Sequence, residues 1–220
     1  MKKTLISLMV AALTLLCSCA PSPKANILVV SENGGHHKPF TDVAVPWLDS
    51  ISASRGFTVT VINNMNDVNA EFLKNFNAVI QLDFPPYTWP EAAQEAFIEY
   101  VEKGLGGYIE PLADGTVHIE STEHPLFKGV DPVFTIPDDE WYTYDKDPRD
   151  TEYIHVLASV DEDSYRPASD IRMGDHPVIW TNTSVKARNI YFQFGHSPKL
   201  LENDNFKTLL LNAIDWVTEK

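Results

Sequence analysis

The sequence predicts one α/β domain built on a doubly wound, mostly parallel sheet with helices on both faces, with antiparallel strands extending it in the second half. In the first half, continuous apolar runs typical of strands buried on both faces alternate with amphipathic helical stretches. Strand–helix–strand crossovers of this kind are almost always right-handed and form parallel sheets. In the second half the strand-like runs have little helix between them, which indicates antiparallel pairing.

The helices and strands of the first half are predicted from the spacing of apolar residues and from residues that favour helix ends. In the first long helix an apolar stripe includes Trp47 and Ile51, and Gly56 suits the left-handed residue that ends many helices. Pro46 is expected to delay the start of this helix or to kink it. Strands are expected at 26–31, 57–62, 78–82 and 106–110, and helices at 41–55, 70–76 and 89–103.

The second half is expected to contain five strands and a closing helix. The helix, at 205–218, places Phe206, Leu209 and Leu210 on one buried stripe together with Ala213 and Val217. The acidic runs 138–140 and 161–163 lack the spacing of a calcium-binding loop, so we expect solvated turns there. The strands are expected at 117–120, 133–136, 152–160, 177–181 and 189–194.

The N-terminus resembles the export signal of a bacterial lipoprotein. Lys2 and Lys3 precede a short apolar run that is too short to span a membrane. The run ends Leu-Cys-Ser-Cys, the lipobox pattern, in which cleavage before Cys19 leaves that thiol to carry the lipid. We therefore expect a signal peptide at 1–18, a lipidated Cys19 with a short tether at 19–25, and a location in the cell envelope, outside the cytoplasm. The alternative is an ordinary cleaved signal in which Cys19 has no role.

The folded domain is expected at 26–220, and its composition excludes some classes of chemistry and of binding partner. Both cysteines lie in the processing segment, so the mature domain has neither a disulfide nor a thiol nucleophile. Removing Lys2 and Lys3 from the 17 basic residues leaves 15 against 31 acidic ones, or about −16. This charge opposes binding to nucleic acid or to an anionic membrane surface. The lipid is therefore the expected membrane contact.

Four segments, taken in order, make the chain similar to the ThuA-like (trehalose utilisation) family. The first is a strand with a Gly/His loop, and the second is a helix that leads into a Gly-rich strand. The third is a His-Pro element followed by an acidic-aromatic run, and the fourth is a C-terminal strand block that closes on Ala-Ile-Asp-Trp. These segments are 27–37, 97–107, 124–142 and 177–216.

The resemblance implies a fold like that of class I glutamine amidotransferases and a sugar-related role. The amidotransferase reaction itself is excluded, because the mature domain has no Cys nucleophile. Similar family members generally place a His shortly after the Gly-rich strand, whereas residues 108–112 contain none. We therefore hold two functions open: a carbohydrate-processing protein, or a sugar-binding or scaffold lipoprotein that kept the fold and lost the site.

Polar residues that follow strands are the candidates for chemistry, because ligands of doubly wound sheets bind outside the carboxyl ends of the strands. His37 follows the first strand and His196 the last long one, and the resemblance adds Glu140. These three are the expected catalytic residues. Asp83 and Glu110, after the third and fourth strands, are expected to bind substrate.

Two chemistries fit this set. A His–carboxylate pair can move protons near neutral pH. The same residues could bind a divalent metal, although no tight metal-binding spacing is present. The sequence therefore leaves two alternatives: a site without a cofactor, or a site that binds a divalent metal.

Aromatic residues beside Glu140 suggest the ligand class. Flat rings next to carboxylates suit sugars, whose C–H faces pack on rings while their hydroxyls take hydrogen bonds. Trp141 and Tyr142 are accordingly expected to form a pocket wall for a small sugar derivative. His176, next to Pro177, is expected to be structural.

Overall fold

The computed structural model describes residues 24–66, 68–83, 107–108, 112–144 and 146–219. The helix expected at 89–103 and the candidate Glu110 lie outside these residues. In the described part, no helix is long and apolar enough to cross a membrane.

A three-stranded parallel sheet forms the first half of the described fold. Strand β1 (Ala25–Val30) lies between β2 (Phe57–Ile62) and β3 (Ala78–Gln81) and is parallel to both. All of β1 except Asn26 is buried, which explains its continuous apolar run. The predicted parallel α/β unit is therefore confirmed in these strands.

Helix α1 (Lys38–Arg55) packs against β2 and starts earlier than expected. The short 3-10 helix η1 (Gly35–His37) leads directly into it, and Pro46 lies inside the helix. Gly56 ends α1 in the left-handed conformation, with φ of 78°, and its N–H bonds the carbonyl of Ser52. The one-turn helix α2 (Ala70–Leu73) connects β2 to β3.

The second half forms a sheet of its own, which corrects the expected extension of the parallel sheet. Its five antiparallel strands have the order β10-β9-β8-β5-β6. Short connections without crossover helices permit only this antiparallel pairing. The bounds are β5 (Ala113–Ile119), β6 (Val133–Asp139), β8 (Ile154–Arg166), β9 (Pro177–Asn182) and β10 (Tyr191–Phe192).

The fourth expected strand is also placed differently. Strand β4 (Gly107–Tyr108) pairs antiparallel with β7 (Tyr142–Thr143) and, in the described residues, with neither of the larger sheets. A doubly wound arrangement with helices on both faces therefore remains a prediction.

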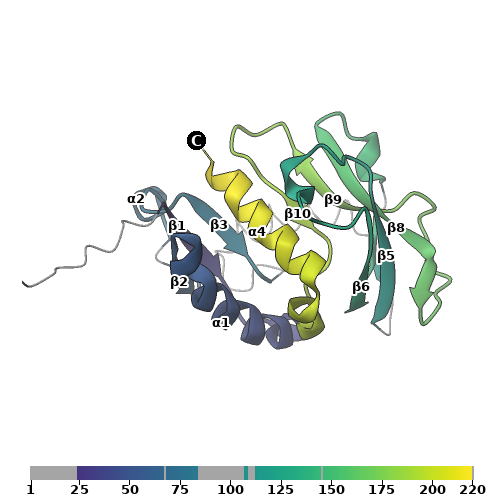
Figure 1. Cartoon of the computed structure of the whole chain (residues 1–220), viewed down its shortest axis with the longest axis horizontal. Coiled ribbons are helices and arrows are strands. Elements are labelled where there is room, and N and C mark those ends of the chain that lie inside the picture. The colour runs from purple at the N-terminus through teal and green to yellow at the C-terminus, as the bar shows by residue number, and fades with distance from the viewer. Residues whose placement is uncertain (1–23, 67, 84–106, 109–111, 145, 220) are drawn as a thin grey trace, which may run out of the picture.

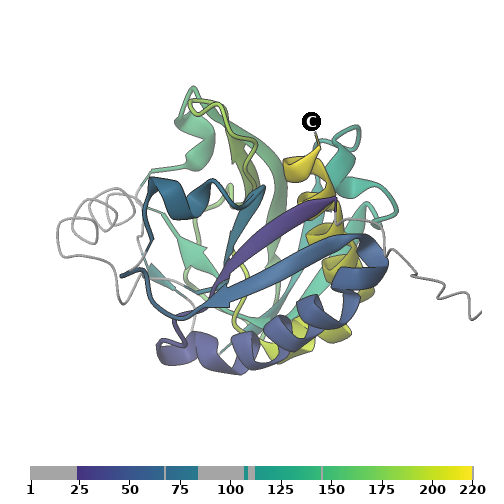
Figure 2. The same ribbon diagram turned by 90° about the vertical axis from the view of Figure 1, so that its left-hand side faces the viewer.

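In the view of Figure 1, helix α4 (Asp204–Thr218) lies between the strands of the parallel sheet and those of the five-stranded sheet. It contacts β3 and the 3-10 helix η2 (Pro125–Phe127). It starts one residue before the predicted 205, and four of the five predicted stripe residues are buried, whereas Val217 is only partly buried. Figure 2 shows α1 and the beginning of α4 side by side, and α1 contacts the 3-10 helix η4 (Pro198–Glu202) that precedes α4.

Candidate active site

Three segments that are distant in sequence meet at one buried cluster. His37 ends η1 just after β1, Glu140 follows β6, and His196 lies between β10 and η4. Their side chains are nearly buried, with exposed fractions of 9%, 9% and 6%. The cluster therefore joins the carboxyl end of the parallel sheet to the antiparallel sheet.

The imidazole of His196 is bonded at both nitrogens. Its Nδ1 lies 2.9 Å from Oδ1 of Asp139, which is fully buried. Its Nε2 lies 3.0 Å from the hydroxyl of Tyr142 and 3.3 Å from Oε2 of Glu140. A ring held by one carboxylate and facing a second acid group is the arrangement of a proton-transfer residue.

Asp139 is locked in place by the backbone. Its carboxylate accepts hydrogen bonds from the N–H groups of Glu140, Gly195 and His196 at 2.9, 3.2 and 3.3 Å. These bonds satisfy an anion that would otherwise be costly to bury. Asp139 therefore fixes both the position and the orientation of the His196 ring.

Sequence reasoning missed Asp139 because it assigned the run 138–140 to a solvated turn. Buried positions alternate in β6 at Phe134 and Ile136, which would put residue 138 on the inner face. Asp138 instead has φ of 52°, so the alternation shifts by one residue and Asp139 turns inward. No periodic pattern in the sequence signals this shift.

His37 stacks on His196, with ring centroids 4.6 Å apart and planes tilted by 38°. Burial, and next the nearby His196, lower the pKa of His37 from 6.5 to about 4. His37 is therefore neutral at pH 7. His37 therefore adds no positive charge beside the ring of His196 at this pH.

Tyr142 is a hydrogen-bond donor in this site. Burial, followed by its hydrogen bond to Glu140, raises the pKa of the Tyr142 hydroxyl well above its usual range. The phenol is therefore protonated at neutral pH, donates to Oε2 of Glu140 and lies beside His196.

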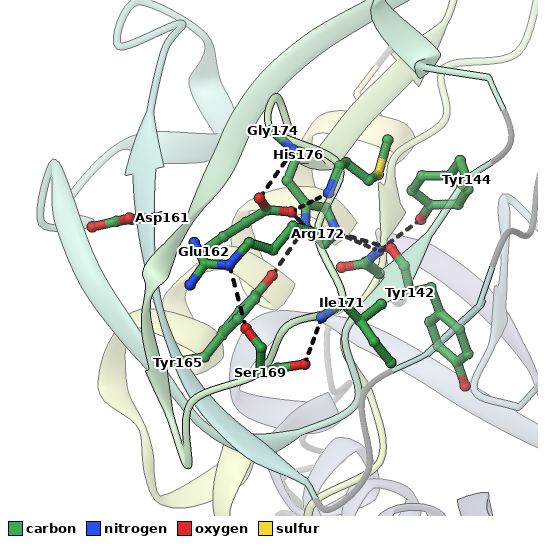
Figure 3. A network of polar contacts seen from close by, with 12 residues as sticks. Tyr142, Tyr144, Asp161, Glu162, Tyr165, Ser169, Ile171, Arg172, Gly174 and His176 are labelled. Atoms are coloured by element: carbon green, nitrogen blue, oxygen red, sulfur yellow. Dashed lines mark hydrogen bonds and ion pairs between the residues drawn. The ribbon is translucent and has the colours of Figure 1, made fainter.

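A second buried network holds the main chain of Tyr142 (Figure 3). Nε2 of His176 lies 2.8 Å from the Tyr142 carbonyl, and the Gln193 amide donates to the same oxygen. On its other side, Nδ1 of His176 lies 2.9 Å from both Oε1 of Glu162 and the Tyr165 hydroxyl. The expected structural role of His176 thus agrees with a ring that is 0% exposed and fully engaged.

Two of the expected substrate-binding residues have other roles. Trp141 is 0% exposed, and its indole N–H donates to the Ala113 carbonyl, so it is a core residue and does not form a pocket wall. Asp83 is 3% exposed and accepts hydrogen bonds from the N–H groups of Glu32 and Asn33. It fastens the loop that carries His37. Trp141 was misassigned because a residue's place in the sequence does not show which way its side chain turns, whereas substrate binding by Asp83 stays a prediction.

The metal alternative has less support than proton transfer in this site. Within the described ranges, no group of three or more His, Cys, Asp or Glu side chains is arranged to hold a metal ion. His196 is instead engaged by hydrogen bonds and close carboxylate contacts at both nitrogens.

A family model described as trehalose utilisation, ThuA, matches residues 26–110 and 105–217. The chain belongs to the ThuA family. Membership suggests a role in trehalose utilisation or, more broadly, in carbohydrate metabolism. A comparison with curated proteins finds no match.

Two solved structures share the ThuA fold with this chain. A ThuA-like protein from Bacteroides uniformis ATCC 8492 is 22% identical with a TM-score of 0.78, over 91% of this chain and 94% of that one. A ThuA-like protein from Parabacteroides merdae ATCC 43184 is 18% identical with a TM-score of 0.59, over 90% of each chain. At these identities the similarity shows the fold alone.

Proposed function

We propose that this ThuA family member processes a sugar derivative by acid/base chemistry in the cell envelope, tethered to a bacterial membrane through Cys19. The observation that carries the proposal is the ring of His196, fixed by buried Asp139 at one nitrogen and facing Tyr142 and Glu140 at the other. Positioned proton-transfer groups of this kind contribute about 10²–10⁴-fold to a rate.

Each group has a distinct role in the proposed chemistry. His196 accepts the substrate proton, and the carboxylates of Asp139 and Glu140 stabilise the charge that the ring gains. Tyr142, kept protonated by burial, would turn its single O–H from Glu140 to a substrate oxygen when a substrate is bound. Neutral His37 packs on His196 and can accept or donate a hydrogen bond.

The experiment uses the full chain, purified in detergent, with glucose, fructose and trehalose in D₂O. NMR follows product formation and deuterium incorporation at carbon, which reports proton abstraction even where no product accumulates. We expect His196→Gln to lower the rate by about 10²-fold or more. His118→Gln, on an exposed position of β5, is the matched control and should keep the wild-type rate. An unchanged rate in His196→Gln would overturn the proposal.

The second candidate, a non-catalytic sugar-binding lipoprotein, is favoured by the absence of a His from residues 108–112. The same samples separate the two functions. Binding of a sugar without exchange or turnover in the wild type would support the binding protein and end the catalytic proposal.

A further inference from the structure

A recess of about 560 Å³ lies at the carboxyl ends of β1 and β2. Residues of the first half of α1 line it, together with residues of α2 and of the connection from β2 to α2. The described residues that line it do not include His37, Glu140 or His196, so the recess is distinct from the candidate active site. Its volume lies within the range of small-molecule sites, and the carboxyl ends of parallel strands are where such sites form.

A buried hydroxyl in the recess has no partner in the described part of the chain. Ser31, which directly follows β1, lines the recess and is 3% exposed. Its N–H bonds the carbonyl of Ile62, but its hydroxyl makes no hydrogen bond to another described residue. Buried polar groups are normally hydrogen-bonded, because an unpaired one costs free energy. A ligand in the recess would supply the missing partner.

Asparagine amides make up much of the remaining polar lining. Asn33, with φ of 57°, accepts a hydrogen bond at its Oδ1 from the Thr41 hydroxyl at 3.3 Å. Nδ2 of Asn64 donates to Oδ1 of Asn63 at 3.1 Å, which leaves the NH₂ group of exposed Asn63 for a ligand. A pair of amides presents donors and acceptors side by side, which is the pattern that the edge of a nucleobase matches.

The charge of the recess favours a neutral ligand. No Lys, Arg or His is among the described residues that line it. Its carboxylate, on Asp42, is already paired with the Lys38 ammonium at 2.6 and 2.8 Å. The chain as a whole has a net charge of −14, which opposes anions. A phosphate group would therefore find no counter-charge in the lining described.

The apolar part of the lining suits a flat ring. Val61 is 44% exposed on β2, and it lines the recess together with Val45 and Phe72. Such residues can pack on the face of a base while polar groups bond its edge. A sugar alone would place hydroxyls against these apolar side chains, and hydroxyls without hydrogen bonds are costly to bury.

We infer that this recess binds a neutral nucleoside, with the face of the base on the apolar residues and its polar edge at Asn63. A ribose hydroxyl bonds the hydroxyl of Ser31. The inference goes beyond the proposed function and is independent of it, because the residues that carry it take no part in proton transfer at His196.

Titration calorimetry on the full chain in detergent tests the inference with adenosine, inosine, uridine, AMP and ribose. We expect the nucleosides to bind, AMP to bind more weakly than adenosine, and ribose not to bind. Asn63→Asp keeps the acceptor for Asn64 but removes the NH₂ donor, so nucleoside affinity should fall about 10-fold. Ser31→Ala should also weaken binding, while the urea midpoint of the free protein stays unchanged because the hydroxyl has no protein partner to lose.

Asn66→Asp is the matched control, because it makes the same chemical change at an exposed position nearby that does not line the recess. It should keep the wild-type affinity. No binding of any nucleoside would overturn the inference, as would AMP binding as tightly as adenosine. Unchanged nucleoside affinity in both Asn63→Asp and Ser31→Ala would place the ligand elsewhere and overturn it too. None of these results bears on His196-dependent exchange, so the proposed function is tested separately.

Discussion

At the residue scale, the environment of His37 makes stability depend on pH. Its native pKa of about 4 lies below the unfolded value of 6.5, so between these values the unfolded chain binds the proton more readily. The contribution of neutral His37 to the free energy of unfolding is therefore complete above pH 6.5, and it is lost as the pH falls toward 4. The wild type should lose on the order of 2–3 kcal/mol of unfolding free energy from this group across the window.

Urea unfolding at pH 7.5 and pH 4.5 measures this effect. In His37→Gln the difference between the two pH values should shrink by that amount, because the titrating group is gone. His36→Gln removes an exposed neighbouring imidazole and should keep most of the wild-type dependence. An identical pH dependence in His37→Gln and wild type would contradict the assignment.

A second residue-scale prediction concerns Gly115, which lies against the buried indole of Trp141. A Cβ at this position would approach Trp141 Cζ2 to 2.3 Å, and neither the fully buried ring nor the strand has room to move away. Gly115→Ala should therefore lower the unfolding free energy by about 1–3 kcal/mol. Gly195→Ala is the control, since the nearest atom there, on Phe40, is 3.8 Å away. Equal urea midpoints for the two variants would contradict the prediction.

At the element scale, the buried pair of Glu162 and His176 joins β8 and β9 to the main chain of β7. Glu162 also accepts hydrogen bonds from the N–H groups of Met173 and Gly174, at 2.6 and 3.0 Å, so its carboxylate is fully committed. Removing the imidazole takes one partner from that buried acid and leaves the carbonyl of Tyr142 with the Gln193 amide as its donor.

His176→Ala should accordingly destabilise the protein by about 1–3 kcal/mol, because buried groups of Glu162 and Tyr142 each lose a hydrogen-bond partner. Arg55→Ala removes one partner of the exposed ion pair with Asp215 and should cost at most about 1 kcal/mol. Thermal or urea unfolding of both variants measures the contrast between a buried and an exposed pair. Similar small losses would mean that the network around His176 relaxes when it is broken.

At the scale of the whole molecule, we propose that a lipid on Cys19 holds the domain at the membrane. Cys19→Ala removes the only thiol expected to remain after processing, so the variant should leave the membrane fraction. Cys17→Ala is a matched control in the same segment, upstream of the expected cleavage point, and should remain membrane-bound. Immunoblots of soluble and membrane fractions read out both variants. Cys19→Ala that still partitions with the membrane would refute the anchor.

The candidate site also belongs to the whole molecule, because it joins two sheets formed by different halves of the chain. The sequence predicted β1, β2 and β3, α1 and α4 closely, since apolar runs and helical stripes are local patterns. It also placed His37 and His196 among the candidates, because residues after strand ends gather at one edge, and the family resemblance added Glu140. It did not predict the separate antiparallel sheet, since pairing partners are chosen over long sequence distances.

The sequence by itself determined the α/β class and the family resemblance, and it placed both cysteines in the first 19 residues. The signal cleavage and the lipid tether at Cys19 stay predictions. Only the tertiary structure decided which side chains face one another. It turned Asp139 inward through the left-handed backbone of Asp138, buried Trp141 and committed Asp83 to a loop. The physical reason is that side-chain direction depends on one backbone torsion and on packing against distant strands, and neither leaves a periodic trace in the sequence.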